Sequence, residues 1–319
     1  MNLLDLFSGI GGFHLGLERA GFKINSFNSE INKYANQVYK NNFKNSTYVG
    51  SVADVRGSDL PRINAITFGS PCQDFSLAGK QKGMGGERSS LILEAIRLVK
   101  ECRPDFFIWE NVKGTFSSNN RQDFAAILQA FTNIGGYRLE WQLLNTKWFL
   151  PQNRERVYLV GYTSNKSGGQ IFPITRESNG VIKNNKINIG SARTRKYMNQ
   201  AQKLEIRNDN STNTLTSVQK DNYVLGDSRD RKGKVMSRHK KKLANTLHAS
   251  SGSGNNTDQF INSIRKLTPL ECERLQGFPD DWTKFGTEGL ISNTQRYKMC
   301  GNAVTVDVVE AVGKQILKL

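Results

Sequence analysis

Near its amino terminus the chain reads Leu4-Asp5-Leu6-Phe7-Ser8-Gly9-Ile10-Gly11-Gly12-Phe13. An apolar run, a glycine-rich turn and the start of an amphipathic stretch follow one another, which predicts a strand, a tight turn and a helix. Glycines in such a turn let bare backbone approach a ligand closely. Glu30 lies 21 residues beyond Gly9, and an acid at about that separation is suited to hydrogen-bonding both hydroxyls of a ribose.

This pattern indicates a nucleoside-containing cofactor and does not distinguish a dinucleotide from S-adenosylmethionine. The alternative is a tight glycine turn with a helix-capping acid.

Up to about residue 162, short apolar runs alternate with longer amphipathic stretches. The predicted strands are residues 3–7, 23–28, 64–68, 105–109, 139–145 and 156–162, and the predicted helices are residues 12–20, 31–42, 89–102 and 121–133. We expect a doubly wound, mostly parallel α/β fold.

The amino-acid composition changes after residue 163, where Asn, Ser, Thr, Lys and Gly replace the apolar runs. Short β elements are predicted at 212–216 and 243–247. A helix is predicted at 268–277, with Thr268 as N-cap and Gly277 as the stop, and another at 304–317. We therefore expect a large domain, residues 1–163 completed by 291–319, and a small domain of residues 164–290.

The charge of the chain is concentrated in one region. The formal net charge is +17, and residues 163–264 hold 18 Lys and Arg against 7 Asp and Glu, a net +11. Such a surplus implies a polyanionic partner, nucleic acid before membrane, although a charged loop facing solvent is the alternative.

The four cysteines and three histidines are dispersed, so no disulfide framework and no metal site are predicted. With no long apolar run and a strand at its start, the chain is expected to be soluble and cytoplasmic.

Two chemically useful side chains follow predicted strands. Cys72 comes soon after the strand at 64–68, and Glu110 directly follows the strand at 105–109. In open α/β sheets, ligands bind in the crevice beyond the carboxyl ends of the strands, so both residues are candidates for a reaction centre. A thiolate can add to an electron-poor ring while a carboxyl group donates to the ring nitrogen. A buried core cysteine and an ordinary strand-end acid are the alternatives.

Arg154 and Arg156 enter the strand at 156–162 at alternate positions, so their side chains project from one face. Two guanidinium groups there can bind a phosphate or a carbonyl oxygen. They can also lower the pKa of a neighbouring thiol, because positive charge favours the thiolate. Solvated arginines on an edge strand are the alternative.

In this order, these segments resemble the DNA cytosine-5 methyltransferases of bacteria and phage. The resemblance spans nearly the whole chain, and the segments that carry it are Phe7 to Gly12, Glu30, Pro71-Cys72-Gln73, Glu110-Asn111-Val112, Gln152 to Arg156, Arg265 to Trp282 and Gly301 to Val304. It implies an S-adenosylmethionine-dependent enzyme with a catalytic domain, a small target-recognition domain and DNA in the cleft between them.

The resemblance also implies a role for each candidate residue. Cys72 would attack C6 of a flipped-out cytosine, Glu110 would contact N3 and the amino edge, and Arg156 would meet O2. Arg154 would support the catalytic loop, and Gln73 belongs to the same catalytic set. Attack from above the ring plane requires the base to leave the stack.

For the cofactor, the resemblance implies contacts from the glycine turn, from Glu30 and from the later motifs. The implied residues are Phe7, Ser8, Gly9, Ile10, Gly11, Gly12, Glu30, Ile31, Ser51, Val52, Gly69, Pro71, Leu91, Asn302, Ala303 and Val304. One position departs from the family pattern, because Ser51 stands where an acid usually accepts from the adenine amino group. Either Ser51 accepts that hydrogen bond more weakly or Asp54 replaces it.

Thr246-Leu247 resembles the element that braces the backbone around the flipped base, and Thr214-Leu215 is a competing candidate. Basic residues between 229 and 242 are expected to face phosphates, among them Arg231, Lys232, Lys240 and Lys241. The expected partner is double-stranded DNA, bound by a monomer, with a cognate restriction endonuclease as a further partner if the enzyme is not solitary or phage-encoded. The alternatives are a transfer-RNA cytosine methyltransferase of the same fold and a catalytically silent DNA-binding protein.

Overall fold

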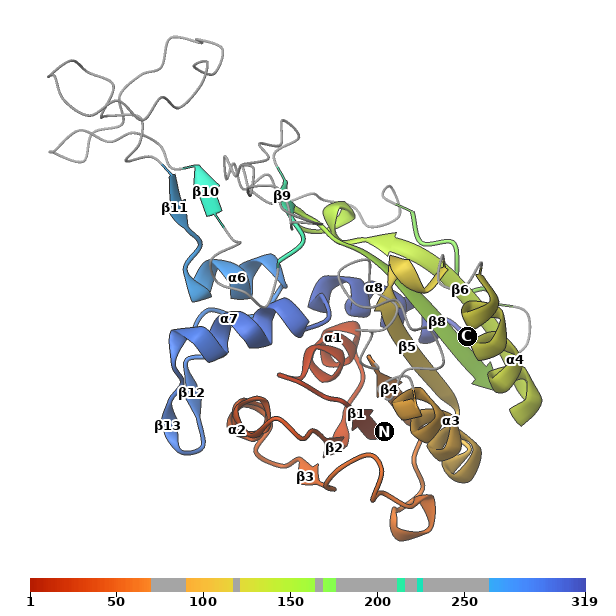
Figure 1. Ribbon diagram of the computed structural model, residues 1–319. Coiled ribbons are helices and arrows are strands. Elements are labelled where there is room, and N and C mark those ends of the chain that lie inside the picture. Colours follow the sequence, from red (N-terminus) through yellow and green to blue (C-terminus); the bar gives the residue numbers. More distant parts are fainter. Residues whose placement is uncertain (70–89, 117–120, 164–168, 176–210, 216–222, 226–263) are drawn as a thin grey trace, which may run out of the picture.

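The computed structural model describes residues 1–69, 90–116, 121–163, 169–175, 211–215, 223–225 and 264–319. At its centre is a seven-stranded sheet in the order β3-β2-β1-β4-β5-β8-β6 (Figure 1). Its strands are β1 (Asn2–Leu6), β2 (Asn25–Ser29), β3 (Thr47–Tyr48), β4 (Ala65–Phe68), β5 (Phe106–Val112), β6 (Tyr137–Asn145) and β8 (Glu155–Thr163). The strand β8 is antiparallel to both of its neighbours, β5 and β6, and the other strand pairs of this sheet are parallel. This confirms the mostly parallel α/β fold.

Helices cover both faces of the sheet. Alternate strand residues point to opposite faces, so Leu3 packs with α1 (Gly12–Ala20) and α8 (Val306–Ile316). Leu4 packs on the other side with α3 (Ser90–Cys102) and α4 (Gln122–Ile134). The remaining helices are α2 (Lys33–Asn42), α6 (Pro269–Leu275) and α7 (Asn293–Asn302), with short 3-10 turns η1 (Gly57–Asp59), η3 (Lys113–Phe116) and η5 (Thr146–Trp148). No described helix is long and apolar enough to cross a membrane.

The predicted strands and helices of the first 163 residues are confirmed, with small shifts at their ends. Some elements along the chain were missed, among them β3 and α7. The strand β3 has only two residues, too short for a sequence pattern. The helix α7 is largely polar on its outer side and shows little apolar periodicity. The expected helix at 304–317 begins at Val306, because Ala303 and Thr305 are extended.

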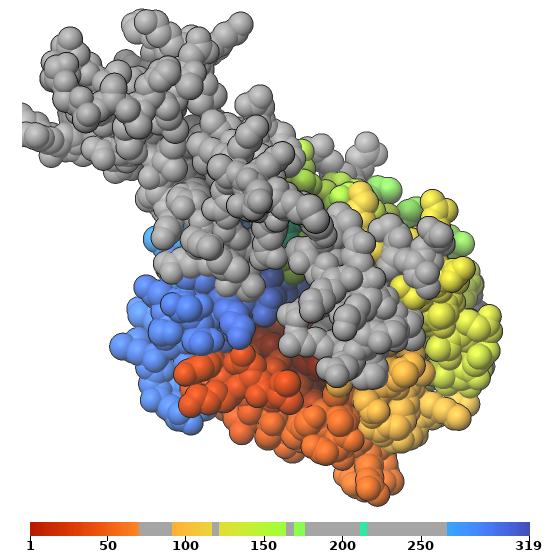
Figure 2. Space-filling view, in the orientation of Figure 1, coloured from red at the N-terminus to blue at the C-terminus, as the bar shows by residue number. Residues whose placement is uncertain are grey.

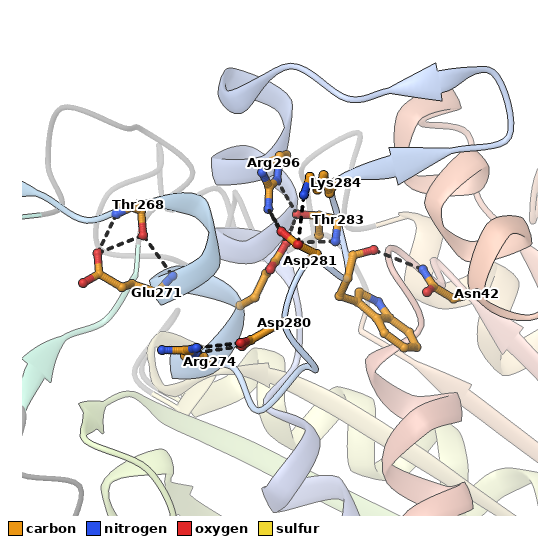
Figure 3. Close-up of polar contacts among 11 residues, drawn as sticks. Asn42, Thr268, Glu271, Arg274, Asp280, Asp281, Thr283, Lys284 and Arg296 are labelled. Atoms are coloured by element: carbon orange, nitrogen blue, oxygen red, sulfur yellow. Dashed lines mark hydrogen bonds and ion pairs between the residues drawn. The ribbon is translucent and has the colours of Figure 1, made fainter.

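The expected helix at 268–277 is confirmed as α6. Thr268 and Glu271 form a reciprocal capping box at its start, and Gly277 follows its end with a φ of 81°. A buried ion pair then fastens α6 to α7, because Glu273 Oε1 lies 2.9 Å from Arg296 Nη2 (Figure 3). The same carboxylate accepts from the Thr283 amide at 2.8 Å, so the loop between the two helices is held as well.

Three small strand pairs complete the described residues. The strand β7 (Gln152–Asn153) pairs with β9 (Thr212–Asn213), β10 (Tyr223–Leu225) with β11 (Ile264–Lys266), and β12 (Phe285–Gly286) with β13 (Gly289–Leu290). The first bears out the β element expected near 212, whereas the one expected at 243–247 lies outside the described residues. Most of 164–263 also lies outside them, so the division into two domains stays a prediction.

The carboxyl-terminal part packs directly on the amino-terminal part. Trp282 Nε1 donates to the carbonyl oxygen of Ile10 at 2.9 Å, and Asn42 donates to the carbonyl oxygen of Trp282 at 3.1 Å. Figure 2 shows the red and blue ends of the chain side by side on one face. Residues 240 and 272 positions apart in the sequence are thus in direct contact.

The helices α1 and α8 approach closely at Gly16. A Cβ atom placed there would lie 2.6 Å from the side chain of Val309 and 2.9 Å from the carbonyl oxygen of Val306. We expect Gly16→Ala to lower the free energy of unfolding by about 1–3 kcal/mol despite its better helix propensity, because the helices must separate. Urea unfolding measures this. Val309→Ala should recover part of the loss in the double variant, and an unchanged or increased stability of Gly16→Ala would contradict the close packing.

Asp5 lies in β1 with no exposed surface and accepts a hydrogen bond from Thr67 Oγ1 at 2.8 Å. Burial raises the pKa of Asp5 from 3.8 to about 8. Between these values the native state keeps a proton that the unfolded chain has lost, so stability falls as pH rises through this window. We expect Asp5→Asn, which mimics the protonated acid, to flatten the loss of unfolding free energy between about pH 7 and pH 8. The exposed Asp59 provides the control as Asp59→Asn, and equal slopes in Asp5→Asn and the wild type would refute the prediction.

Candidate active site

A cavity of about 530 Å³ lies at the carboxyl ends of β1, β2, β4 and β5. This is the edge of an open α/β sheet where ligands bind. One part of its wall comes from the turns after β1 and β2, and another from β5, β8 and the end of α7. Its lining residues are Phe7, Gly9, Ile10, Ser29, Glu30, Ile31, Asn32, Ala35, Ser51, Val52, Gly69, Leu91, Glu110, Val112, Arg154, Arg156, Lys298, Met299, Gly301, Asn302 and Ala303.

The turn after β1 is built by backbone geometry. Gly11 forms the N-cap of α1 with a φ of 84°, and a Cβ atom on it would lie 2.3 Å from the ring of Phe43. Only glycine meets both requirements. The turn is tied to the next strand by a hydrogen bond from the Ser8 amide to the carbonyl oxygen of Ser29 at 3.1 Å. It therefore presents Phe7, Gly9 and Ile10 to the cavity.

Glu30 is fixed by the backbone at both of its oxygens. Its Oε2 accepts from the Gly9 amide at 2.9 Å, and its Oε1 accepts from the Asn32 amide at 2.7 Å. A carboxylate has about four acceptor positions, so each oxygen can accept a further hydrogen bond from a ligand. The side chain next to it, Ile31, is 79% exposed, which leaves a large apolar surface at the rim of the cavity.

On the other side of the cavity, Glu110 and Arg156 form an ion pair. Glu110 Oε1 lies 3.1 Å from Arg156 Nε, and their side chains are 10% and 16% exposed. The pair is diagonal across β5 and β8, because Glu110 is opposite Tyr158 and Val112 is opposite Arg156. A Cβ atom on Gly69 would lie 3.3 Å from Glu110 Oε2. The carboxylate thus sits beside the point where the chain leaves β4.

Arg154 is buried and reaches the end of α7. Its Nη2 donates to the carbonyl oxygen of Ala303 at 2.9 Å, and its Nη1 to that of Gly301 at 3.3 Å. These contacts fix the backbone of residues that line the cavity. Arg154 lines the cavity too, and its support of the loop that carries Cys72 stays a prediction, because residues 70–89 lie outside the described residues.

The cavity brings together most of the residues that the sequence singled out. The predicted residues that line it are Phe7, Gly9, Ile10, Glu30, Ile31, Ser51, Val52, Gly69, Leu91, Glu110, Arg154, Arg156, Asn302 and Ala303. Four predicted residues lie beside it without lining it, namely Ser8, Gly11, Gly12 and Val304. Outside the described residues lie Pro71, Cys72, Gln73, Arg231, Lys232, Lys240, Lys241, Thr246 and Leu247.

Several lining residues were not predicted. Ser29, Asn32 and Ala35 flank Glu30, and their nearness to that acid was the only available signal. Lys298 and Met299 belong to α7, the helix that the sequence did not reveal. Lys298 adds a third cationic side chain to a wall that already holds two arginines.

Thr214 and Leu215, the competing candidate for the element that braces the flipped base, are among the described residues and lie next to β7. Thr214 Oγ1 donates to the carbonyl oxygen of Asn153 at 2.8 Å, and the Leu215 amide donates to Gln152 Oε1 at 2.9 Å. Leu215 is 3% exposed and packs against α6 and α7.

Among the described residues, no cluster of His, Cys, Asp and Glu could hold a metal ion.

The fold resembles solved methyltransferase structures. A methyltransferase of Entamoeba histolytica, EhMeth, aligns with 100% of this chain and 98% of its own, at a TM-score of 0.67 and 19% sequence identity. At that level of identity the likeness concerns the fold alone.

Sequence comparison is more specific. The type II methyltransferase M.Bsp6I of Bacillus sp. (strain RFL6) is 30% identical over 328 residues, which cover 100% of this chain and 99% of that protein. The orphan methyltransferase M.SPRI of Bacillus phage SPR is 27% identical, with 99% of this chain and 97% of that protein covered. The model of the C-5 cytosine-specific DNA methylases matches residues 1–318. With the cavity at the strand ends and the sheet order described above, the chain belongs to the C-5 cytosine-specific DNA methylase family.

Proposed function

We propose that this member of the family transfers a methyl group from S-adenosylmethionine to C5 of a flipped-out cytosine in a specific duplex sequence, through a covalent bond between Cys72 and C6. The supporting observation is that one cavity joins the turn at Gly9 and Glu30 to the ion pair of Glu110 and Arg156. A methyl donor and a cytosine ring could therefore meet inside a single cavity.

The residues around Glu30 fit the proposed cofactor. Glu30 can accept from ribose hydroxyls, while Phe7, Ile31 and Val52 offer apolar surface for a planar base. The volume of about 530 Å³ lies in the range of small-molecule sites. When bound, the cofactor supplies a methyl group on a positively charged sulfur.

Glu110 and Arg156 fit the polar edge of a cytosine. The carboxyl group would hold the amino edge and pass a proton to N3, and the guanidinium group would donate to O2. Because Arg156 lies against Glu110 at 3.1 Å, the two groups have one relative position before any base arrives. Such a fixed arrangement avoids reorganisation during the reaction.

Cys72 lies outside the described residues, but it follows Gly69 by three positions, a length that spans at most about 11 Å. Gly69 itself borders Glu110. Thiolate addition at C6, with protonation of N3, turns the ring into an enamine whose C5 takes the methyl group. Removal of the C5 proton and elimination of the thiol then restore the aromatic ring and the enzyme.

DNA would approach from the side of β7 and β9. Thr214-Leu215 is held against Gln152 and Asn153, immediately before the arginines of the cavity. This placement supports Thr214-Leu215 as the brace around the flipped base, with Thr246-Leu247 as the other candidate. The basic residues between 229 and 242 would add salt-sensitive phosphate contacts.

Bisulfite sequencing of host DNA after expression of the protein tests both activity and target. Conversion-resistant cytosines in one recurring sequence are expected, and their absence would contradict the proposal. Duplex DNA and transfer RNA tested side by side separate the two nucleic-acid substrates. Extracts of the natural host that cleave the unmethylated target DNA but not the methylated one would indicate a cognate restriction endonuclease. The relatives include both a type II and an orphan methyltransferase.

Cys72→Ser should abolish methyl transfer, by several orders of magnitude, and covalent trapping by duplex DNA that contains 5-fluorocytosine. The alcohol is far less nucleophilic than the thiolate, whereas cofactor binding does not use it. Denaturing gel electrophoresis detects the trapped complex, and titration with S-adenosylhomocysteine measures binding. Cys102→Ser, at a half-buried cysteine outside the cavity, should behave as the wild type. Trapping retained in Cys72→Ser would move the nucleophile elsewhere.

Ser51→Asp should leave activity intact. Ser51 lines the cavity, whereas Asp54 is exposed and is not part of the lining. A carboxylate at position 51 can accept the hydrogen bond of the adenine amino group, as serine does, and more strongly. Steady-state KM for S-adenosylmethionine, compared with the exposed-site control Ser58→Asp, measures the effect. A large loss of activity in Ser51→Asp alone would contradict the assignment of position 51.

A further inference from the structure

Gln276 is buried between the cavity wall and the 214–215 segment. It caps the end of α6 and has no exposed surface. Its Nε2 donates to the carbonyl oxygen of Cys300 at 2.7 Å and to that of Ala303 at 3.4 Å, and its Oε1 accepts from Thr305 Oγ1 at 3.0 Å. The side chain therefore holds both ends of the segment that contains Gly301 and Asn302, two residues of the cavity wall.

Gln152 continues this connection toward the recognition segment. It is also fully buried. Its Nε2 donates to the carbonyl oxygen of Leu275 at 2.7 Å and lies 3.5 Å from Gln276 Oε1. Its Oε1 accepts from the Leu215 amide at 2.9 Å. One side chain thus bridges the 214–215 segment and the end of α6.

The neighbours of both glutamines are held in place by other contacts. The end of α6 cannot shift freely, because the Glu273–Arg296 ion pair holds the helix against α7 (Figure 3). Gln276 uses both hydrogens and both acceptor positions of its amide, so it fits one arrangement of its neighbours. A buried amide that loses such partners costs about 1–3 kcal/mol, so a displacement at one end is opposed at the other.

We propose that Gln276, together with Gln152, is a positioning residue that couples DNA binding at the 214–215 segment to cofactor binding at the 301–303 wall. Neither glutamine lines the cavity, so each acts through the backbone that it holds. DNA that fixes Leu215 fixes Gln152 and the end of α6, and with it the carbonyl groups of residues 300 and 303. The cofactor then meets a wall that is already ordered. This coupling rests on the proposed function, since it takes the cavity as the cofactor site and the 214–215 segment as the brace that meets DNA.

The test compares the dissociation constant of S-adenosylhomocysteine with and without saturating duplex DNA carrying the mapped target. Isothermal titration of the full-length protein provides both values, and their ratio is the coupling factor. The variants are Gln276→Met and Gln152→Met, which keep the volume but remove the hydrogen bonds. Gln142→Met is the matched control, because Gln142 also grips a backbone amide and carbonyl, both of Ile174, but at the edge strand β6.

In the wild type, DNA is expected to tighten S-adenosylhomocysteine binding by about 5-fold or more, and both glutamine variants should reduce this factor by about threefold or more. Gln142→Met should keep it, whatever stability it loses. A merely structural role would lower stability in all three variants and leave the factor unchanged, which would overturn the proposal, as would a factor of one in the wild type. If S-adenosylhomocysteine does not bind the wild type at all, the cofactor assignment itself fails.

Discussion

Buried carbonyl groups at the end of α7 set the strongest constraint on this molecule. The carbonyl oxygens of residues 300, 301 and 303 point into the interior, where an unpaired polar group is expensive. Gln276 and Arg154 satisfy them. Since Arg154 immediately precedes β8 of the sheet and residues 301–303 line the cavity, the same hydrogen bonds that remove a penalty also place residues 301–303 opposite the glycine turn.

The sheet and its first helices could be predicted because their signals are local. Short, continuous apolar runs mark β1, β4 and β5, and the capping residues of α6 mark its ends. The helix α7 escaped because its stability comes from partners distant in sequence. Arg296 is paired with Glu273, and Tyr297 donates to the carbonyl oxygen of Leu267. Tertiary contacts of this kind leave no periodic pattern to read.

The candidate site was predictable to the extent that its side chains follow strands. Glu30 and Glu110 lie at or near the carboxyl ends of parallel strands, which meet at one edge of the sheet. Arg156 lies at the start of β8, which reaches the same edge because β8 is antiparallel to β5. The contribution of Lys298 and Met299 was not predictable without α7. Nor does any sequence signal show that Arg154 donates to the carbonyl groups of residues 301 and 303, since that depends on where these residues lie in the fold.

The pairing of α1 with α8 has a consequence for biogenesis. Gly16 and Leu17 form a face whose partner, including Val309 and Gly313, is synthesised some 290 residues later. Until then this face has no native cover, and closing so long a loop is slow. The nascent chain can assemble local strand and helix pairs but not the full core. A growing chain would therefore remain inactive and exposed to proteases until α8 docks. A prematurely terminated chain that lacks α8 would stay so.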